Sequence, residues 1–281
     1  MINQQGTFTG HGKTDLFYQS WLPDQNMQAA LIIIHGGGDH SGRFENVVNA
    51  VVPDGFGIYM FDLRGHGKSP GKRGHINSWQ EYRDDLSAFV ELVRPMNPEV
   101  PLFLFGHSMG AIIALDYCIR HQPDFAGVIC TSPAIGKLGI PPFLFRLAKV
   151  LDKTWPSLVL PNRLVVPHLS RDADFIKRTQ ADPLYHTLSS PRFGMEMLKT
   201  IDFVHANASS FKLPFYLIHG QDDKIASIEG SRRFKANLSH PDVIFKTYEG
   251  GYHELFNDLD KETVLNDLKE WLHLKSRSGI G

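Results

Sequence analysis

Short apolar runs alternate with helical patterns along this chain, and this alternation constrains its fold more than any other feature. The runs are rich in β-branched or aromatic residues, as strands are, and lie at residues 14–22, 29–34, 57–61, 102–105, 126–131, 214–219 and 243–248. Strands that alternate with helices form a mostly parallel sheet with helices on both faces. We therefore predict an α/β fold, in which residues 14–22 form an early edge strand.

Two helical patterns are clear in the sequence. Between residues 78 and 94 the apolar residues recur every three or four positions, which predicts an amphipathic helix, and Ser78 and Glu81 have the spacing of a capping box. Residues 264–272 repeat the pattern near the C-terminus. The polar residues 275–281 that follow are expected to be a frayed tail.

The interval from 133 to 213 is too long for a simple crossover between two parallel strands. It is rich in proline and contains apolar helical pieces such as residues 143–151. We predict a helical cap at 136–206 over the carboxyl edge of the sheet, where open α/β sheets bind ligands. The core would then comprise residues 1–135 and 207–281. The alternative is a second helical layer with no role in binding.

Composition limits the possible partners and the cellular context. With 281 residues, of which 42% are apolar, the chain can bury one large core. Its net charge of −1 provides no field that would attract nucleic acid. Neither a signal sequence nor an apolar run long enough to span a membrane is present in the sequence, so a cytoplasmic location is expected. Cys118 and Cys130 lie in apolar surroundings and are predicted to be reduced and buried.

The strongest local motif is Gly-His-Ser-Met-Gly at residues 106–110, between the run at 102–105 and a predicted helix at 111–120. A sharp turn from strand to helix lifts the central serine above the sheet, and small residues on either side let neighbouring backbone pass closely. The helix N-terminus adds partial positive charge where an oxyanion would form. We predict that Ser108 is a nucleophile; the alternative is a tight turn capped by a serine.

A serine nucleophile needs a base that removes its proton, so a carboxylate and a histidine are expected further along the chain. Asp222 and Asp223 follow the run at 214–219, and His253 follows the run at 243–248. Both sites therefore lie at the same edge of the predicted sheet as Ser108. We expect His253 to act first as general base and then as general acid, while one of the two aspartates orients its ring.

The oxyanion hole should combine the N–H of Met109 with an N–H from a loop after an early strand. The three glycines at 36–38 follow the run at 29–34 and leave their backbone N–H groups unobstructed. Gly37 is the predicted donor, with Gly38 as the alternative. The glycines do not complete a phosphate-binding motif, and the mechanism requires neither a metal ion nor another cofactor, so none is expected.

Most of the remaining histidines are expected to be solvated or hydrogen-bonded to nearby residues, because they lie in polar segments or at helix ends. This group comprises His66, His75, His121, His186, His205, His240 and His273.

Four segments, in order, resemble the monoacylglycerol lipase and lysophospholipase branch of the α/β hydrolases. They read His-Gly-Gly-Gly-Asp-His-Ser-Gly-Arg-Phe at 35–44, Asp-Leu-Arg-Gly-His-Gly-Lys-Ser at 62–69, the motif at 106–110, and Tyr-Glu-Gly-Gly-Tyr-His at 248–253. The likeness extends over nearly the whole chain. It implies the α/β-hydrolase fold, a cap that admits one acyl chain, and the following residues: Ser108, Asp223 and His253 as a catalytic triad, with Gly37 and Met109 as oxyanion donors.

Two positions depart from the pattern of this branch. Related loops often carry Glu where this chain has Asp39, and lipase members often carry His where it has Phe256. Both positions are expected to contact the alcohol part of the substrate. Arg43 belongs to the same loop as Asp39 and is also included among the expected substrate-binding residues.

The resemblance favours hydrolysis of a lipid ester with a single acyl chain, monoacylglycerol above all. Lysophospholipids, short carboxylic esters and thioesters need the same residues and remain alternatives, as does a peptidase. Apolar cap residues such as Phe143 and Leu147 are expected to line the acyl site, to touch a membrane surface transiently, or to pack on the sheet. Epoxide hydrolases and dehalogenases use an aspartate nucleophile, so Ser108 argues against them. A binding module with slow turnover is the remaining, non-enzymatic alternative.

Overall fold

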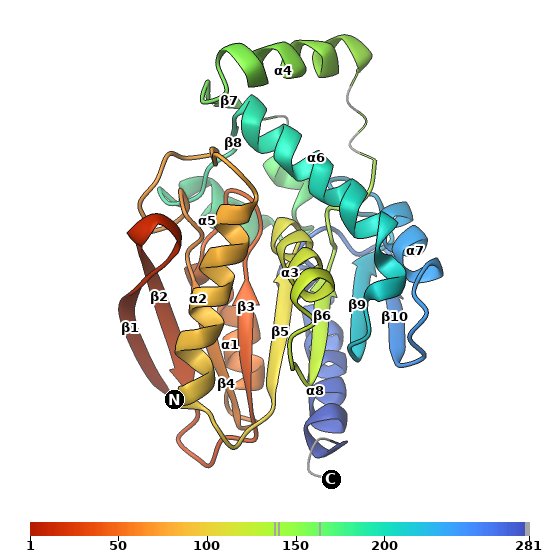
Figure 1. Cartoon of the computed structure of the whole chain (residues 1–281). Helices are drawn as coiled ribbons and strands as arrows, with labels where there is room; N and C mark the ends of the chain where they lie inside the picture. The colour runs from red at the N-terminus through yellow and green to blue at the C-terminus, as the bar shows by residue number, and fades with distance from the viewer. Residues whose placement is uncertain (138, 140, 163, 279–281) are drawn as a thin grey trace.

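An eight-stranded sheet forms the centre of the molecule, with the strands in the order β1-β2-β4-β3-β5-β6-β9-β10. Figure 1 shows the sheet flanked by helices in a computed structural model, which describes residues 1–137, 139, 141–162 and 164–278. β1 and β2 are antiparallel to their neighbours, and the remaining strands are parallel. The predicted α/β fold is therefore confirmed.

The seven predicted strands are all present, and their ends agree with the prediction to within two residues. The strands of the sheet are β1 (Ile2–Thr9), β2 (Asp15–Leu22), β3 (Ala29–Ile34), β4 (Phe56–Phe61), β5 (Leu102–His107), β6 (Gly127–Thr131), β9 (Phe215–Gly220) and β10 (Val243–Tyr248). The central strands β3, β4, β5, β6 and β9 are buried along their whole length. Burial on both faces explains why their sequences are continuous apolar runs without alternation.

Strand β1 was not predicted from the sequence. It pairs with β2 through an antiparallel ladder that extends from Ile2 opposite Leu22 to Thr9 opposite Asp15. Phe8 is its only buried side chain. A polar strand at the edge of a sheet is held mainly by its backbone ladder, so an analysis of apolar runs does not detect it.

Helices cover both faces of the sheet. They are α1 (Glu45–Val51), α2 (Gln80–Met96), α3 (Met109–His121), α7 (Ile228–Ala236) and α8 (Lys261–Ser278). Apolar side chains of α2 and α3 pack in one core cluster, and those of α1 and α8 pack in a second cluster on the opposite face. The helix predicted at 78–94 is confirmed, but Ser78 and Glu81 do not form a capping box: the Glu81 carboxylate accepts hydrogen bonds from Asn77.

The segment between β6 and β9 lies over the carboxyl ends of the parallel strands (Figure 1). It contains α4 (Pro142–Thr154), β7 (Leu160–Pro161), η3 (Val166–His168), α5 (Ala173–Ala181), β8 (Leu188–Ser189), α6 (Pro191–Ala206) and η4 (Ala208–Ser210). Strands β7 and β8 form a separate two-stranded sheet. α4 lies across α6, farthest from the central sheet.

Three further predictions concern the chain end, membrane spans and the cysteines. Residues 275–278 are the last turn of α8 rather than a frayed tail, and residues 279–281 lie outside the described residues. Within the described part of the chain, no helix combines the length and apolar character needed to cross a membrane. Cys118 and Cys130 are both free and buried, as predicted.

Candidate active site

A sharp turn between β5 and α3 presents the side chain of Ser108. This residue has φ of 52° and ψ of −114°, a strained conformation for a residue with a side chain. Added Cβ atoms at Gly106 and Gly110 would lie 2.6 Å from the Cα of Ala111 and 2.2 Å from the carbonyl oxygen of Ile34. The two glycines are therefore required by close backbone packing around the turn.

Ser108, His253 and Asp223 form a continuous chain of hydrogen bonds. His253 Nε2 lies 2.9 Å from Ser108 Oγ, and His253 Nδ1 lies 2.8 Å from Asp223 Oδ2. Because a carboxylate accepts hydrogen bonds, Nδ1 carries the proton and Nε2 is free to accept the serine proton. This is the geometry required for general-base activation of a serine.

Asp223 is held as a carboxylate by an unusual number of donors. Its Oδ1 accepts the backbone N–H groups of Ile225 and Ala226, at 2.8 and 2.9 Å. Its Oδ2 faces His253 and also lies 3.2 Å from Nε2 of His219. Burial alone would raise the pKa of Asp223, but the charge of His253 and the hydrogen bonds from both histidines outweigh it and hold this pKa well below its usual range. The alternative acid, Asp222, is exposed.

The predicted oxyanion residues lie beside Ser108 on the wall of one cavity. Gly37 and Met109 both line it, and a Cβ atom at Gly37 would have the Met109 side chain as its nearest neighbour. The next residue, Gly38, has φ of 77°. Its carbonyl accepts the N–H of His186, and an added Cβ would lie 1.9 Å from the His186 carbonyl oxygen. The loop is thus fixed against the segment that crosses above it.

The cavity at Ser108 has a volume of about 610 Å³. Its far walls are mostly apolar and come from the segment between β6 and β9, including Leu144, Leu188, Phe193 and Met197. A smaller polar part of the lining comprises His66, Asn162, His168 and Lys224. An apolar cavity with a few polar groups near the reactive side chain suits an apolar ligand that carries a small polar group.

Asp39 and Arg43 lie in a buried ionic cluster outside the cavity lining. Arg43 Nε lies 2.6 Å from Asp39 Oδ1, and its Nη2 lies 3.1 Å from Glu254 Oε1. Arg43 also donates to Thr179 Oγ1 of α5 at 2.7 Å. The guanidinium group stacks over the Tyr185 ring, 4.9 Å from its centre. Arg43 thus links α5 to Glu254, the residue that follows His253. Neither Asp39 nor Arg43 lines the cavity, so the structure does not support their predicted contact with the substrate.

Phe256 is also buried away from the cavity wall. Its ring stacks on Phe44 at 4.9 Å between centres and meets the edge of His107 at 5.1 Å. The expected contact of Phe256 with the alcohol part of the substrate is therefore wrong, because its side chain fills the core beneath the site.

Several histidines have environments that the sequence did not predict. His66 has the predicted local hydrogen bond, with Nδ1 3.0 Å from the carbonyl oxygen of Arg64, but its burial at the cavity wall, with 2% exposure, was not predicted. Its ring packs on His35 and His186, with ring centres 5.4 and 4.9 Å apart. Burial lowers the pKa of His66 well below its ordinary value, and the neighbouring histidines add to this effect. His205 bonds to the distant carbonyl of Ile135 rather than to a local group.

Among the described residues, no group of three or more His, Cys, Asp or Glu side chains is arranged to hold a metal ion. The candidate site brings Ser108, His253 and Asp223 together at the carboxyl edge of the sheet.

This fold and this hydrogen-bonded chain define the class of the protein: it is a serine hydrolase of the α/β-hydrolase fold. The sequence profile of the family described as "Serine aminopeptidase, S33" matches residues 25–260. The chain belongs to this family and, within it, to the branch of α/β hydrolases that contains the monoacylglycerol lipases.

Relatives of known sequence or structure agree with this assignment. The chain is 30% identical to a monoacylglycerol lipase of Mycolicibacterium smegmatis, over 95% of both chains. It is 31% identical to the phospholipase YtpA of Bacillus subtilis, over 87% of this chain and 95% of that protein. The crystal structure of Paleococcus ferrophilus monoacylglycerol lipase superposes with a TM-score of 0.85 and 35% identity, covering 92% of this chain and 99% of that one.

Proposed function

We propose that this serine hydrolase cleaves lipid esters with a single acyl chain, and that monoacylglycerol is its substrate. The observation that carries the proposal is the position of Ser108 Oγ, 2.9 Å from His253 Nε2 at the wall of a mostly apolar cavity. Relatives named as monoacylglycerol lipases support this choice of substrate. The relative named as a phospholipase makes lysophospholipid the second candidate.

The proposed reaction follows from the geometry of the site. Ser108 Oγ attacks the ester carbonyl carbon while His253 Nε2 takes the serine proton, and Asp223 stabilises the resulting imidazolium. The backbone N–H groups of Gly37 and Met109 stabilise the oxyanion. His253 then protonates the leaving alcohol, and the acyl group remains on Ser108. Water, activated by His253, attacks this acyl-enzyme and releases the fatty acid.

We propose that residues 136–206 form a cap, with the core made of residues 1–135 and 207–281. α4 exposes Phe143, Leu147 and Val150, with relative exposures of 69%, 50% and 57%. Lysine and arginine side chains flank these residues on the same helix. An exposed apolar stripe with basic neighbours suits transient contact with a lipid surface, where monoacylglycerol resides.

A fluorophosphonate probe tests the enzymatic assignment directly. It should label wild-type protein stoichiometrically and leave the Ser108→Ala variant unlabelled, because only an activated serine reacts with it. A folded wild-type protein that remains unlabelled would instead favour a binding module with slow turnover.

A substrate panel tests the proposed ester class. Monoacylglycerols and lysophospholipids with the same acyl chain should be compared at matched concentrations, together with nitrophenyl esters. The proposal expects a higher kcat/KM for monoacylglycerol than for lysophospholipid. A reversed preference would assign the site to lysophospholipid.

A further inference from the structure

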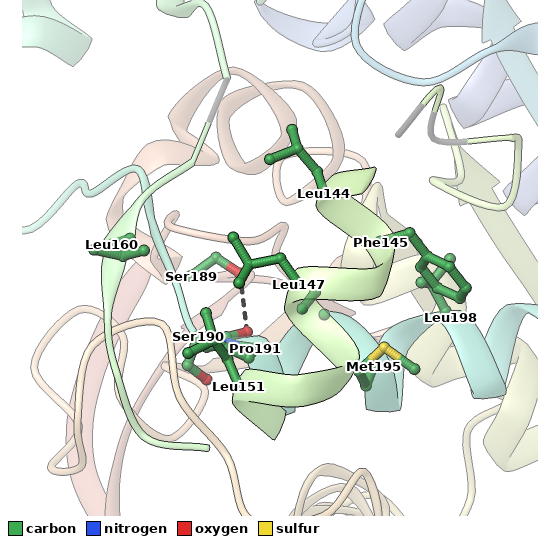
Figure 2. Close-up of a pocket in the computed structure, with 12 residues that line it drawn as sticks. Leu144, Phe145, Leu147, Leu151, Leu160, Ser189, Ser190, Pro191, Met195 and Leu198 are labelled. Carbon is green, nitrogen blue, oxygen red and sulfur yellow. Dashed lines mark hydrogen bonds between the residues drawn. The ribbon is translucent and has the colours of Figure 1, made fainter. Parts of the chain in front are cut away.

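A second apolar cavity lies between α4 and α6, on the side of the cap away from the sheet. It has a volume of about 270 Å³. Figure 2 shows its lining, with Phe145 of α4 beside Leu198 and Met195 of α6, while Leu160 closes the opposite side. Among the residues that the structure describes, no charged side chain lines this cavity. The cavity depends on how α4 and α6 cross, so no local sequence pattern predicts its shape.

The polar lining of this cavity already has partners within the protein. Ser190 Oγ lies 2.8 Å from His75 Nδ1 and also accepts the N–H of Phe193 at the start of α6. Ser189 Oγ donates to the Ser190 carbonyl at 3.5 Å. The lining therefore offers mainly apolar surface to a ligand, which excludes a sugar, a phosphate or a glycerol head group as its natural occupant.

The second cavity lies directly beside the cavity at Ser108. Leu144, Ser189 and Gly194 line both of them. Gly194 lies within α6, and an added Cβ atom there would have no neighbouring atom within 4 Å. Neither close packing nor a left-handed backbone explains a glycine at this position. Glycine is also less favourable than alanine inside a helix. The absence of a side chain at Gly194 leaves open space where the two cavities meet.

We propose that the cavity between α4 and α6 is a second binding site, which receives the distal end of the acyl chain whose ester group lies at Ser108. The proposal rests on the proposed function, because it requires a long-chain ester as substrate. In this arrangement Gly194 keeps the passage open, and the residues deeper between the helices, such as Leu151, determine the longest chain that fits.

The experiment compares nitrophenyl esters from C4 to C16 and measures the ratio of kcat/KM for the longest ester to that for C4. Each buried methylene contributes about a fourfold gain in binding, so excluding two or more should cost more than tenfold. Gly194→Leu, which blocks the passage, and Leu151→Trp, which fills only the second cavity, should each lower this ratio at least tenfold. Thr154→Trp is the matched control at an exposed position of α4 outside both cavity linings, and it should leave the ratio within about twofold of wild type.

Other outcomes would overturn the proposal. An unchanged ratio in both Gly194→Leu and Leu151→Trp would show that the chain does not reach the second cavity. If free fatty acid alters C4 hydrolysis non-competitively and Leu151→Trp abolishes that effect, the cavity holds a separate molecule. A wild-type protein that hydrolyses C4 but not C16 esters would refute the chain-end site and leave a short-chain esterase. A wild-type protein that hydrolyses no ester would refute the proposed function itself.

A separate observation concerns His219, at the carboxyl end of β9, whose side chain is fully buried. His219 Nε2 lies 2.9 Å from the carbonyl oxygen of Ala226 and 3.2 Å from Asp223 Oδ2. Both oxygens can only accept, so Nε2 carries a proton that they share. His219 Nδ1 lies 2.8 Å from the hydroxyl of Ser231 on α7, which donates to it when the ring is neutral.

We infer that His219 is a positioning residue for Asp223. Its N–H holds Oδ2 at the distance from which Asp223 meets His253, and its bond to Ala226 fixes the loop that supplies the two backbone donors to Oδ1. The inference rests on Asp223 acting as the proposed catalytic acid.

Kinetics as a function of pH test this role. His219→Leu removes the donor, so kcat should fall by about ten- to a hundredfold, the usual effect of losing a hydrogen bond to a charged group. The acid limb of the kcat/KM profile should also move to higher pH, because a carboxylate that has lost a donor stabilises the His253 imidazolium more strongly. His219→Gln, whose amide can donate at a similar position, should restore part of kcat and move the acid limb back towards wild type.

If His219→Leu does not fold, Ser231→Ala provides the second measurement and should move the acid limb in the same direction by a smaller amount. An unchanged acid limb in every folded variant would limit His219 to a structural role. Asp223→Asn separates this failure from a failure of the proposed site: it should lower kcat by about 10⁴-fold, and near-normal activity in that variant would reject Asp223 as the catalytic acid.

Discussion

The two halves of the segment above the active site are held in different ways. From α5 to β8 the chain is bonded to the core: Thr179 accepts from Arg43, Asp182 lies 2.8 Å from His40 Nε2, and the backbone of His186 bonds to Gly38. By contrast, α4 has no buried residue and rests on α6. The α5–β8 half therefore fixes the loop beside Ser108, and under the proposed function the less tightly held α4 adjusts to the acyl chain.

The largest expected effect is the loss of kcat when Ser108, beside the loop that the α5–β8 half fixes, is replaced. Ser108→Ala should lower kcat by roughly 10⁶-fold if the triad acts as a unit. Thermal unfolding of this variant should stay close to that of wild type, because the Ser108 side chain is a small part of the core. A loss of only a few-fold would mean that another residue is the nucleophile.

The second expected effect is a difference in the free energy of unfolding that is lost when an ion pair is removed from each half. Arg43→Met leaves the buried carboxylates of Asp39 and Glu254 unpaired, so the free energy of unfolding should fall by about 3–5 kcal/mol. Arg192→Met is the matched control, since it removes the ion pair with Asp152 on the partly exposed α4. It should cost about 1 kcal/mol or less. If urea titrations show the same loss of unfolding free energy in Arg43→Met and Arg192→Met, the proposed difference between the halves is wrong.

A third effect is the dependence of stability on pH. Burial, the largest influence on both groups, lowers the pKa of His35 and of His186 from 6.5 to about 4. Their stabilising contribution is therefore complete above about pH 6.5 and is lost as the pH falls towards 4, because the unfolded chain binds protons that the folded chain does not. Each such histidine should contribute a slope of about 1.4 kcal/mol per pH unit in this window.

Urea titrations from pH 7 to pH 4 measure this slope. Replacing the exposed His121 by Gln is the control and should not change it. A free energy of unfolding that stays constant from pH 6.5 to 4 would contradict the conclusion that His35 and His186 stay neutral in the folded protein.

The smallest expected effect on stability lies in α4. The double variant Phe143→Ser, Val150→Ser should change the free energy of unfolding by no more than about 0.5 kcal/mol, because both side chains are exposed and neither lines a cavity. Its hydrolysis of monoacylglycerol in phospholipid vesicles should nevertheless fall by about tenfold, since each lost apolar side chain weakens contact with lipid. If the variant hydrolyses substrate in vesicles as fast as wild type does, and both hydrolyse dispersed substrate at the same rate, the lipid contact is ruled out.

The residues that meet at the carboxyl edge of the sheet could be identified from the sequence because their signals are local. A turn from strand to helix at residues 106–110 requires small residues at fixed spacing, and this requirement is visible without any structure. Asp223 and His253 were also identifiable, since loops after parallel strands meet at one edge. Their hydrogen bonds to each other and to Ser108 have the geometry that the order of residues suggested.

The supporting contacts were not predictable in the same way. Arg43 and Glu254 are 211 residues apart, and no pattern around either residue identifies the other as its partner. His219 is the end of an apolar strand in the sequence, and only the path of the following loop brings it to Asp223. The expected substrate contacts of Asp39, Arg43 and Phe256 did not agree with the structure for the same reason: side-chain direction in a loop depends on distant packing.

The sequence by itself therefore determined the class of fold and singled out Ser108, Asp223 and His253, which the structure joins by hydrogen bonds, because periodicity and turn chemistry act over a few residues. The tertiary structure decided the shape of the substrate site. The cavity at Ser108 and the cavity between α4 and α6 depend on how helices distant in sequence cross. The open space at Gly194 becomes part of a cavity only because α4 packs over α6. Side-chain packing between distant elements sets the volume available to a ligand, and that packing is not encoded in any local pattern.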